Sequence, residues 1–402
     1  MAHEMPPWFA DPRYGKFNNK RGLTQTQIDT LVAWTDAGAP QGTGLAPAVP
    51  SFGDRSIELM PRQPDAVVDT IEIPLPPNDV IPNFNITVKA PFTEDKYVEA
   101  VENRPSNRAV THHSSFSAGP LPAGAHHIGV GPLWTPGGPL MNAVPVREDG
   151  SLLTDATFEG AGVEEEEAVA NTAQAQASGR NLGNGMTFYA PGTGQLRFRP
   201  GLVKIIHRDD YLRWGLHYNS TGRPEVDMPS ARFWFAKPGN TVLELKTGLV
   251  NENNLYEGQE LIGNNVKRPN IPAYAENYRV SSLYSVLSDS TLNSLWPHMH
   301  ARGKDMTFTV TYPDGREEII LSVPKYSFEW QLQYQYDQEI KLPAGSMMRV
   351  VSHYDNSANN KFNPAPDQEL PWGAQSWHEM FFPQFNLAID KDVVKTGAQG
   401  TN

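Results

Sequence analysis

Short runs of alternating apolar and polar residues recur along most of the chain. Such alternation is typical of half-buried β-strands, and turns rich in Pro, Gly and Asn separate the runs. We expect strands at 56–60, 67–73, 84–89, 196–206, 211–218, 232–236 and 241–246, and again at 278–287, 306–312, 318–323, 328–336, 348–354 and 380–388. Many short, evenly spaced strands favour an all-β fold of sandwich or jelly-roll domains.

One segment near the N-terminus has a helical pattern instead. Thr24 is a typical N-cap residue, and apolar residues such as Leu31 and Trp34 follow at helical spacing. Gly38 and the residues after it end the pattern. We therefore expect a helix over 26–37.

Changes in composition along the chain predict two tandem jelly-roll-like β-sandwich domains with a short helical N-terminal segment. A stretch rich in Pro and Gly, four successive glutamates and an Ala/Gln-rich run interrupt the first domain. The expected division is 1–53 helical segment and linker, 54–250 first domain with an insertion at about 130–190, 251–272 linker, 273–392 second domain, and 393–402 tail.

Composition and charge exclude several classes of function. The 402 residues include 33 Gly and 35 Pro and carry a formal net charge of −12, and this acidic balance argues against a generic nucleic-acid-binding surface. No apolar run is long enough to span a membrane, and the N-terminus lacks the features of a signal peptide. Because the chain has no cysteine, it has no disulfide, thiolate nucleophile, iron–sulfur cluster or c-type haem attachment.

Histidine provides the candidate chemistry. His112 and His113 are adjacent, His298 and His300 form an H-x-H pair, and His217 lies near the end of a predicted strand. In a regular strand an H-x-H pair presents both rings on one face. Adjacent histidines point to opposite faces, so both can reach one metal only at a bulge, a strand end or a loop edge.

A methionine accompanies these histidines. Met380 follows Trp377 at the start of the last predicted strand. A thioether next to two imidazoles is a soft ligand set that prefers copper to zinc or magnesium.

These ordered motifs resemble the type II copper, ascorbate-dependent monooxygenases, which include peptidylglycine alpha-hydroxylating monooxygenase and dopamine beta-monooxygenase. The chain is most similar to their bacterial branch. The resemblance covers about residues 80–390 and is carried by 92–113, 216–218, 297–305, 312–354 and 372–382. It implies two copper-binding β-sandwich domains and two copper ions per chain.

The resemblance also implies the ligands of each ion. Carried over residue by residue, they are His112, His113 and His217 for the first copper, and His298, His300 and Met380, the catalytic set, for the second. His207 is the alternative to His217, which we prefer because Tyr218 follows it as in the family. His378 is the alternative to Met380 and would favour zinc or a different copper chemistry.

The implied activity is hydroxylation of a C–H bond of a small organic substrate with O2. The electrons come from an external reductant, such as ascorbate or an electron-donor protein. The resemblance places the two coppers across a wet cleft, with substrate near the second, and implies a periplasmic or extracellular location. The alternative is a non-catalytic extracellular structural or binding protein on the same fold. A zinc hydrolase is disfavoured, since no H-E-x-x-H-like general base is present.

The substrate of this chain is expected to differ from a peptide. Peptide-hydroxylating members carry a basic residue two positions before the H-x-H pair, where this chain has Trp296, and a polar amide where it has Phe382. A substrate carboxylate is therefore not expected. Trp296, Phe381, Phe382 and Trp372 predict an apolar or aromatic pocket, although these residues could equally belong to the core.

The N-terminal segment resembles the end of a cytochrome c-like domain, in which Met5 would be the axial haem ligand. The haem-attachment motif C-x-x-C-H is absent, so the chain resembles a truncated form and Met5 has no haem role. We expect the remaining helix to pack on the first copper domain.

Overall fold

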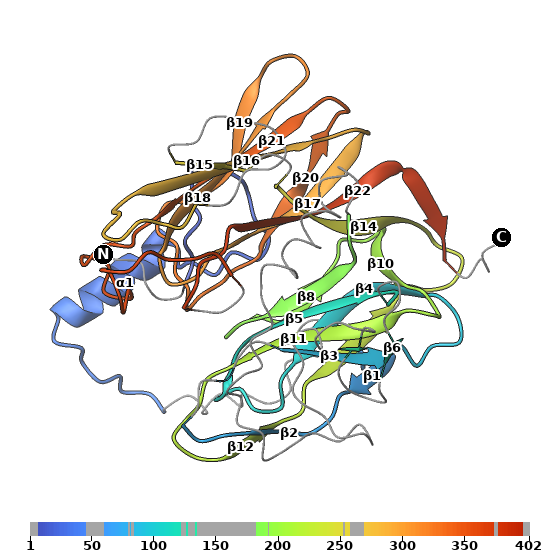
Figure 1. The fold of residues 1–402 in the computed structure, drawn as a ribbon, viewed down its shortest axis with the longest axis horizontal. Helices are drawn as coiled ribbons and strands as arrows, with labels where there is room; N and C mark the ends of the chain where they lie inside the picture. The colour runs from blue at the N-terminus through green and yellow to red at the C-terminus, as the bar shows by residue number, and fades with distance from the viewer. Residues whose placement is uncertain are drawn as a thin grey trace.

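The computed structural model describes residues 7–45, 60–78, 81, 84–121, 126–127, 133–134, 182–191, 193–251, 254–257, 269–373 and 377–396. Within these residues the fold is all-β apart from one helix, α1 (Gln25–Asp36), which confirms the expected fold class (Figure 1). No helix of this described part is long and apolar enough to cross a membrane. Met5 and most of the expected insertion at 130–190 lie outside the described residues.

Among the described residues, fifteen strands come before residue 257. They are β1 (Ala66–Asp69), β2 (Ile73–Leu75), β3 (Phe84–Lys89), β4 (Lys96–Arg104), β5 (Thr111–Gly119), β6 (His126–His127), β7 (Leu133–Trp134), β8 (Gly185–Tyr189), β9 (Gln195–Arg197), β10 (Leu202–Ile206), β11 (Tyr211–Tyr218), β12 (Glu225–Asp227), β13 (Ser230–Phe235), β14 (Thr241–Leu249) and β15 (Leu255–Tyr256).

Seven more strands follow in the second half. They are β16 (Tyr278–Ser285), β17 (Ser290–His298), β18 (Gly303–Thr311), β19 (Glu317–Val323), β20 (Tyr334–Leu342), β21 (Met347–Tyr354) and β22 (Phe382–Lys395). The expected strand at 328–336 was wrong in its first half, because the chain becomes extended only at Tyr334. The expected strand at 56–60 lies almost entirely outside the described residues.

The strands form two sandwiches that share one sheet. A nine-stranded sheet has the order β1-β13-β4-β10-β14-β22-β17-β20, with β9 paired to β4. A four-stranded sheet, β3-β11-β5-β8, covers its first part, and a five-stranded sheet, β15-β16-β21-β18-β19, covers its second part. In Figure 1 the four-stranded sheet lies below the five-stranded sheet.

Each sandwich encloses its own apolar core. The first core gathers side chains such as Phe116, Trp214 and Phe233 from both of its sheets. The second gathers side chains such as Phe308 and Phe385. All five are at most 1% exposed, so each core excludes water and supplies the hydrophobic free energy that holds its two sheets together.

The two halves are joined through backbone pairing. Strand β14 pairs with β22 in an antiparallel register that extends from Thr241 opposite Lys395 to Leu249 opposite Gln384. The shared sheet therefore continues from one sandwich into the other. The division into domains at 54–250 and 273–392 stays a prediction.

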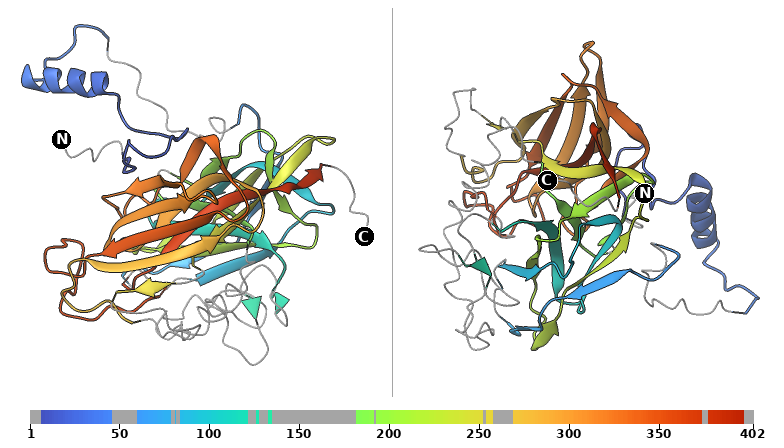
Figure 2. Two further views of the ribbon diagram at one scale, coloured as in Figure 1. Left: turned by 90° about the horizontal axis from the view of Figure 1, so that it is seen from above. Right: turned by 90° about the vertical axis from the view of Figure 1, so that its right-hand side faces the viewer.

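The N-terminal segment does not pack where we expected. Helix α1 is confirmed, with a Thr24–Gln27 capping box, but none of its residues is buried, and Figure 2 shows it projecting from the body of the molecule. The residues before it contact the second half: Trp8 and Phe17 pack edge-on against Tyr334, and Phe17 forms a β-bridge with Tyr336. The expectation that this segment packs on the first copper domain was therefore wrong.

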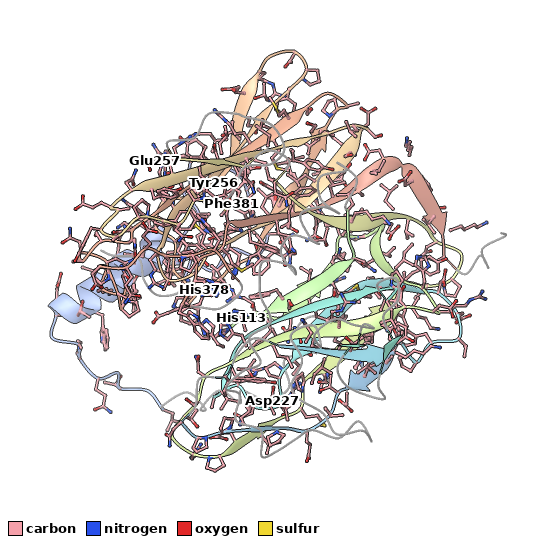
Figure 3. The ribbon with its side chains drawn as sticks, viewed as in Figure 1. His113, Asp227, Tyr256, Glu257, His378 and Phe381 are labelled. Carbon is pink, nitrogen blue, oxygen red and sulfur yellow. The ribbon has the colours of Figure 1, made fainter. Side chains whose placement is uncertain are left out.

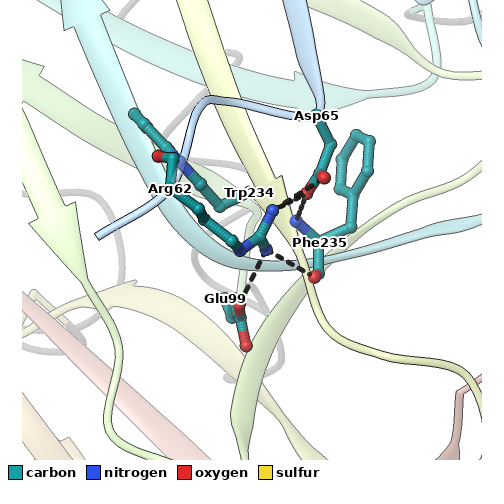
Figure 4. A network of polar contacts seen from close by, with 5 residues as sticks. All are labelled: Arg62, Asp65, Glu99, Trp234 and Phe235. Carbon is teal, nitrogen blue, oxygen red and sulfur yellow. Dashed lines mark hydrogen bonds and ion pairs between the residues drawn. The ribbon is translucent and has the colours of Figure 1, made fainter. Parts of the chain in front are cut away.

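A polar network fastens the segment before β1 to the first sandwich (Figure 4). The Arg62 guanidinium donates to the carboxylates of Asp65 and Glu99, at 2.7 and 2.9 Å, and to the carbonyl of Phe235 at 3.0 Å. The Trp234 indole N–H donates back to the Arg62 carbonyl at 3.0 Å. The network ties this segment to β13 and β4.

Candidate metal centre

A β-bulge brings the adjacent histidines of β5 to one site. In the β5–β11 pairing His217 lies opposite His113, but the next residue, Tyr218, lies opposite Thr111. His112 is therefore the extra residue of a bulge, which re-aims its side chain. A bulge is one of the conditions under which two adjacent histidines can reach the same metal.

The three predicted ligands of the first site are neighbours. Their ring centroids are 5.1 Å apart for His112 and His113, 5.5 Å for His112 and His217, and 4.6 Å for His113 and His217. Nδ1 of His217 lies 2.9 Å from Nε2 of His113. The alternative ligand His207 is not part of this group, because its Nδ1 contacts Asp95 at 3.0 Å with more than half of its side chain exposed.

A buried carboxylate holds the two strands that carry this group. Asp227 accepts hydrogen bonds from the Tyr218 hydroxyl at 2.8 Å and the Thr111 hydroxyl at 3.2 Å. These two residues directly adjoin His217 and His112. The Ser106 hydroxyl and the Asn107 N–H complete the contacts of Asp227, which is fully buried. The carboxylate therefore fixes the positions of β5 and β11 at the bulge.

The second pair of histidines is oriented by hydrogen bonds at Nδ1. His298 is the last residue of β17, and its Nδ1 lies 2.6 Å from Oε1 of Gln331. Nδ1 of His300 lies 3.1 Å from the carbonyl oxygen of His378. Both acceptors require an Nδ1–H, so the lone pair of each ring is on Nε2, the usual state of a metal-ligating histidine. His300 lies beyond the end of β17, so the alternation of one regular strand does not place this pair.

Glu379 links the two segments of the second site. One of its carboxylate oxygens accepts the backbone N–H of His300 at 2.8 Å and that of Met380 at 3.0 Å. The other accepts the backbone N–H of Arg302 at 2.7 Å. Met380 lines the same cavity as His298 and His300, whereas His378 contributes its carbonyl oxygen.

The two sets of histidines form a single cluster. The rings of His113 and His298 are only 6.1 Å apart. Phe328 lies between the sets on one side, 4.7 Å from the ring of His112 and 5.5 Å from that of His300. The rings of the two sets are therefore in contact, whereas the resemblance implies a wet cleft between the sets. Figure 3 shows His113 and His378 where the two halves of the molecule meet.

Burial keeps the imidazoles of the cluster neutral. It lowers the pKa of His217 to about 3, with His112 and His298 adding to the effect. It lowers the pKa of His298 to about 4, against the opposing effect of the hydrogen bond that His298 donates to Gln331. Burial also lowers the pKa values of His113 and His300 well below 6.5. Neutral imidazoles carry the lone pairs that a metal requires.

The donor atoms are of the types that a soft metal ion prefers, but the side chains are not arranged around one common point. Nε2 of His112 and Nε2 of His300 are buried and have no hydrogen-bond partner among the described residues, which is costly unless another group satisfies them. In the same part of the chain, no three His, Cys, Asp or Glu side chains are arranged to hold a metal as they stand. Metal binding would therefore require the rings to turn, and the direct contact between His113 and His217 would have to break.

A cavity of about 290 Å³ adjoins this cluster, and the aromatic residues divide between it and the core. Trp296 and Phe382 line the cavity, as the sequence predicts for a pocket. Trp372 and Phe381 instead pack against the second core, and Figure 3 places Phe381 toward Tyr256. Of the four residues, two are therefore pocket residues and two are core residues.

Several residues of this region were not found by sequence reasoning. Asp227, Gln331, Phe188 and Phe328 belong to no motif. Gln331, Phe188 and Phe328 contact the histidines from distant parts of the chain, and Asp227 contacts Tyr218 next to His217. Glu379 had a signal, because it directly precedes Met380, but nothing in the sequence shows which backbone groups it accepts.

Comparisons with known proteins add little to this geometry. No family model matches the chain, and no curated protein matches its sequence. Among solved structures, it is similar to Arthrobacter globiformis T6 isomalto-dextranase complexed with panose, at 12% identity over 43% of this chain and 27% of that one, with a TM-score of 0.15.

Two other solved structures match over more of the chain. PNGF-II is 12% identical over 79% of this chain and 65% of that one, with a TM-score of 0.24. The N-terminal CBM22-1-CBM22-2 tandem domain of Paenibacillus barcinonensis Xyn10C is 11% identical over 79% and 81%, with a TM-score of 0.14. All these TM-scores are low, so the similarities carry no argument about function.

Proposed function

We propose that the protein is a copper-dependent monooxygenase that hydroxylates a C–H bond of a small organic substrate with O2 and an external reductant. The observation that supports this most is the orientation of His298 and His300. Each has Nδ1 against an acceptor, both line one cavity with Met380, and Nε2 of His300 is buried without a partner. This is a prepared soft donor set beside a space for a small molecule.

The two donor sets would have different roles. His298, His300 and Met380 would hold the copper at the cavity, and His112, His113 and His217 would hold the second one. Bound copper supplies one-electron redox chemistry and O2 activation. Because the rings of His113 and His298 are 6.1 Å apart, the path for electrons between the two sets would be short.

The chain itself would control the surroundings of this chemistry. Burial keeps the imidazoles deprotonated at neutral pH, so protons do not compete with the metal. The buried carboxylates Asp227 and Glu379 hold the segments that carry the donors. Phe188 and Phe328 pack against the imidazoles and limit the access of water to them. The cavity would position the C–H bond next to His298 and His300.

Copper stoichiometry tests the two donor sets. We expect the purified, metal-stripped protein to retain two copper ions per chain after loading and dialysis. His217→Asn should retain one ion, because it removes a donor of the first set only. The control is His207→Asn, which changes an exposed histidine outside the cluster and should retain two. Failure of the wild type to retain copper, or preferential binding of zinc, would contradict the proposal.

Oxygen consumption tests the reaction class. Copper-loaded protein with ascorbate and a substrate that fits the cavity should consume O2 and form a hydroxylated product. His298→Asn should abolish product formation, whereas His207→Asn should not. Copper binding without any reductant-dependent product would favour the alternative, a non-catalytic structural or binding protein.

A further inference from the structure

The cavity beside the histidines is built from both sandwiches. Strands β3, β5, β8 and β11 of the four-stranded sheet form one side, and β17 and β22 of the shared sheet form the other. Its volume of about 290 Å³ is close to the lower end of the range for ligand pockets, about 300–1,000 Å³. It therefore suits a single small molecule.

One part of the lining is aromatic. The rings of Phe188 and Trp296 are 4.0 Å apart, and Phe382 lies 6.1 Å from Trp296. Phe382 is also 6.0 Å from the ring of His298. An apolar or aromatic group packed against these three rings would lie directly next to the predicted copper ligands, and its burial would supply most of the binding free energy.

The remaining lining is polar without being charged. Ser115, Ser117, Thr187 and Gln384 line the cavity, and their side chains have no hydrogen-bond partner within the described part of the chain. Their hydroxyl and amide groups are therefore open to a ligand.

Two other amides of the cavity, those of Asn386 and Gln333, already have partners. Asn386 donates to Ser294 at 3.0 Å and accepts from Thr247 at 2.6 Å. Gln333 donates to the same Ser294 hydroxyl at 3.0 Å. These internal bonds fix one end of the cavity and leave the four free groups to contact a ligand.

The lining that the described residues provide contains no Asp, Glu, Lys or Arg. A carboxylate or an ammonium group would lose its hydration here without gaining a counter-charge, which is strongly unfavourable. A neutral hydroxyl, carbonyl or amide group would lose little, because the free side chains replace its hydrogen bonds to water.

We propose that this cavity binds an uncharged small molecule with an aromatic or apolar body and one or two hydroxyl or carbonyl groups. The body packs on Phe188, Trp296 and Phe382, and the polar group contacts Ser117 or Gln384. The inference rests on the proposed function, because the same cavity holds the predicted catalytic set. Binding to metal-free protein nevertheless tests it independently of copper.

A matched series of three probes tests the charge requirement. Benzyl alcohol, benzoate and benzylamine have similar size and differ mainly in charge. We measure their dissociation constants with metal-free full-length protein at pH 7 by ligand-observed NMR titration. Benzyl alcohol should bind at least about tenfold more tightly than either ion, a ratio equivalent to about 1.4 kcal/mol. Equal or tighter binding of an ion, or no binding of any probe, would overturn the proposal.

Two variants locate the binding in this cavity. Phe382→Ala should weaken benzyl alcohol binding, because it removes part of the aromatic lining. Gln384→Lys should strengthen benzoate binding relative to benzyl alcohol by placing a cation in the cavity. Gln338→Lys is the control, since Gln338 is exposed on β20, and it should leave the ratio unchanged. If Gln338→Lys and Gln384→Lys act alike, the probes bind elsewhere.

The copper measurements distinguish the two proposals. Retention of two coppers with no preference for the neutral probe would overturn only the substrate class. A clear preference for benzyl alcohol in a chain that retains no copper would overturn the oxygenase proposal and leave the cavity assignment in place.

Discussion

The carboxylate of Glu379 accepts the backbone N–H of His300 at 2.8 Å. The same oxygen accepts the N–H of Met380, so one buried side chain fixes both segments of the predicted catalytic set. Glu379 is fully buried, and burial raises its pKa to about 7 against the opposing effect of its three N–H donors. It acts as a positioning residue, because it holds two predicted ligands without being one.

We predict that Glu379→Gln weakens copper binding at the second set alone. The amide replaces one acceptor oxygen with an NH2 group, which opposes a backbone N–H instead of accepting from it. The loss should be about 10–100-fold in copper affinity, with a decrease of about 1–3 kcal/mol in the free energy of unfolding. Chelator-competition titration and urea unfolding measure the two effects. Glu369→Gln, at an exposed position of the preceding loop, is the control, and equal losses in both variants would argue against a positioning role.

Asp227 should have the corresponding role for the first set. Asp227→Ala removes the acceptor of the Tyr218 hydroxyl and one of the two acceptors of the Thr111 hydroxyl, which should lower the free energy of unfolding by about 1–3 kcal/mol. Copper should be lost from the first set and retained by the second, which also shows that the variant is folded. The exposed Asp209→Ala serves as the control. Loss of copper from both sets would mean that Asp227 supports the whole fold and not one site.

Much of the fold follows from local pattern, and the exceptions have a physical cause. Strands β3 and β11 match their predicted ranges, because each alternates apolar and polar residues and has one face in the core. Strand β17 was missed, since all nine of its residues are buried and no alternation remains. Its buried Ser294 has internal partners, since it accepts hydrogen bonds from Asn386 and Gln333.

The candidate site was predictable only in part, for a similar reason. The motifs identify the histidines and Met380, because their spacing is local. The bulge at His112 depends on the register between β5 and β11, two strands about a hundred residues apart in sequence. The contacts of Phe328 with both histidine sets likewise depend on how the two sandwiches meet. Such long-range pairing leaves no pattern in a single sequence.

The stability of the metal-free protein should fall as the pH is lowered from 7 to 5. The pKa of His217 is about 3 in the folded chain and that of His298 about 4, against an ordinary value of about 6.5. The unfolded chain therefore binds more protons in this range, and each such imidazole contributes up to about 1.4 kcal/mol per pH unit. Glu379, whose pKa is raised to about 7, acts in the opposite direction but is a single group.

Urea unfolding of metal-free protein between pH 5 and 8 measures this dependence. His217→Asn should reduce the slope of the unfolding free energy against pH by the contribution of one imidazole. His207→Asn, which changes an exposed histidine outside the cluster, is the matched control. A wild-type protein whose stability is constant over this range would show that the imidazoles do not remain neutral in the folded state.

Met380→Ile separates the two metal sites in function. Isoleucine keeps an apolar side chain in the cavity lining but lacks the thioether that favours Cu(I). We expect the first set to load copper as in the wild type, as measured by metal analysis, while ascorbate-dependent product formation is lost. Met347→Ile makes the same chemical change at a partly exposed position on β21 and should keep wild-type activity. Unchanged turnover in Met380→Ile would remove Met380 from the catalytic set and make a different donor, such as His378, the one to test.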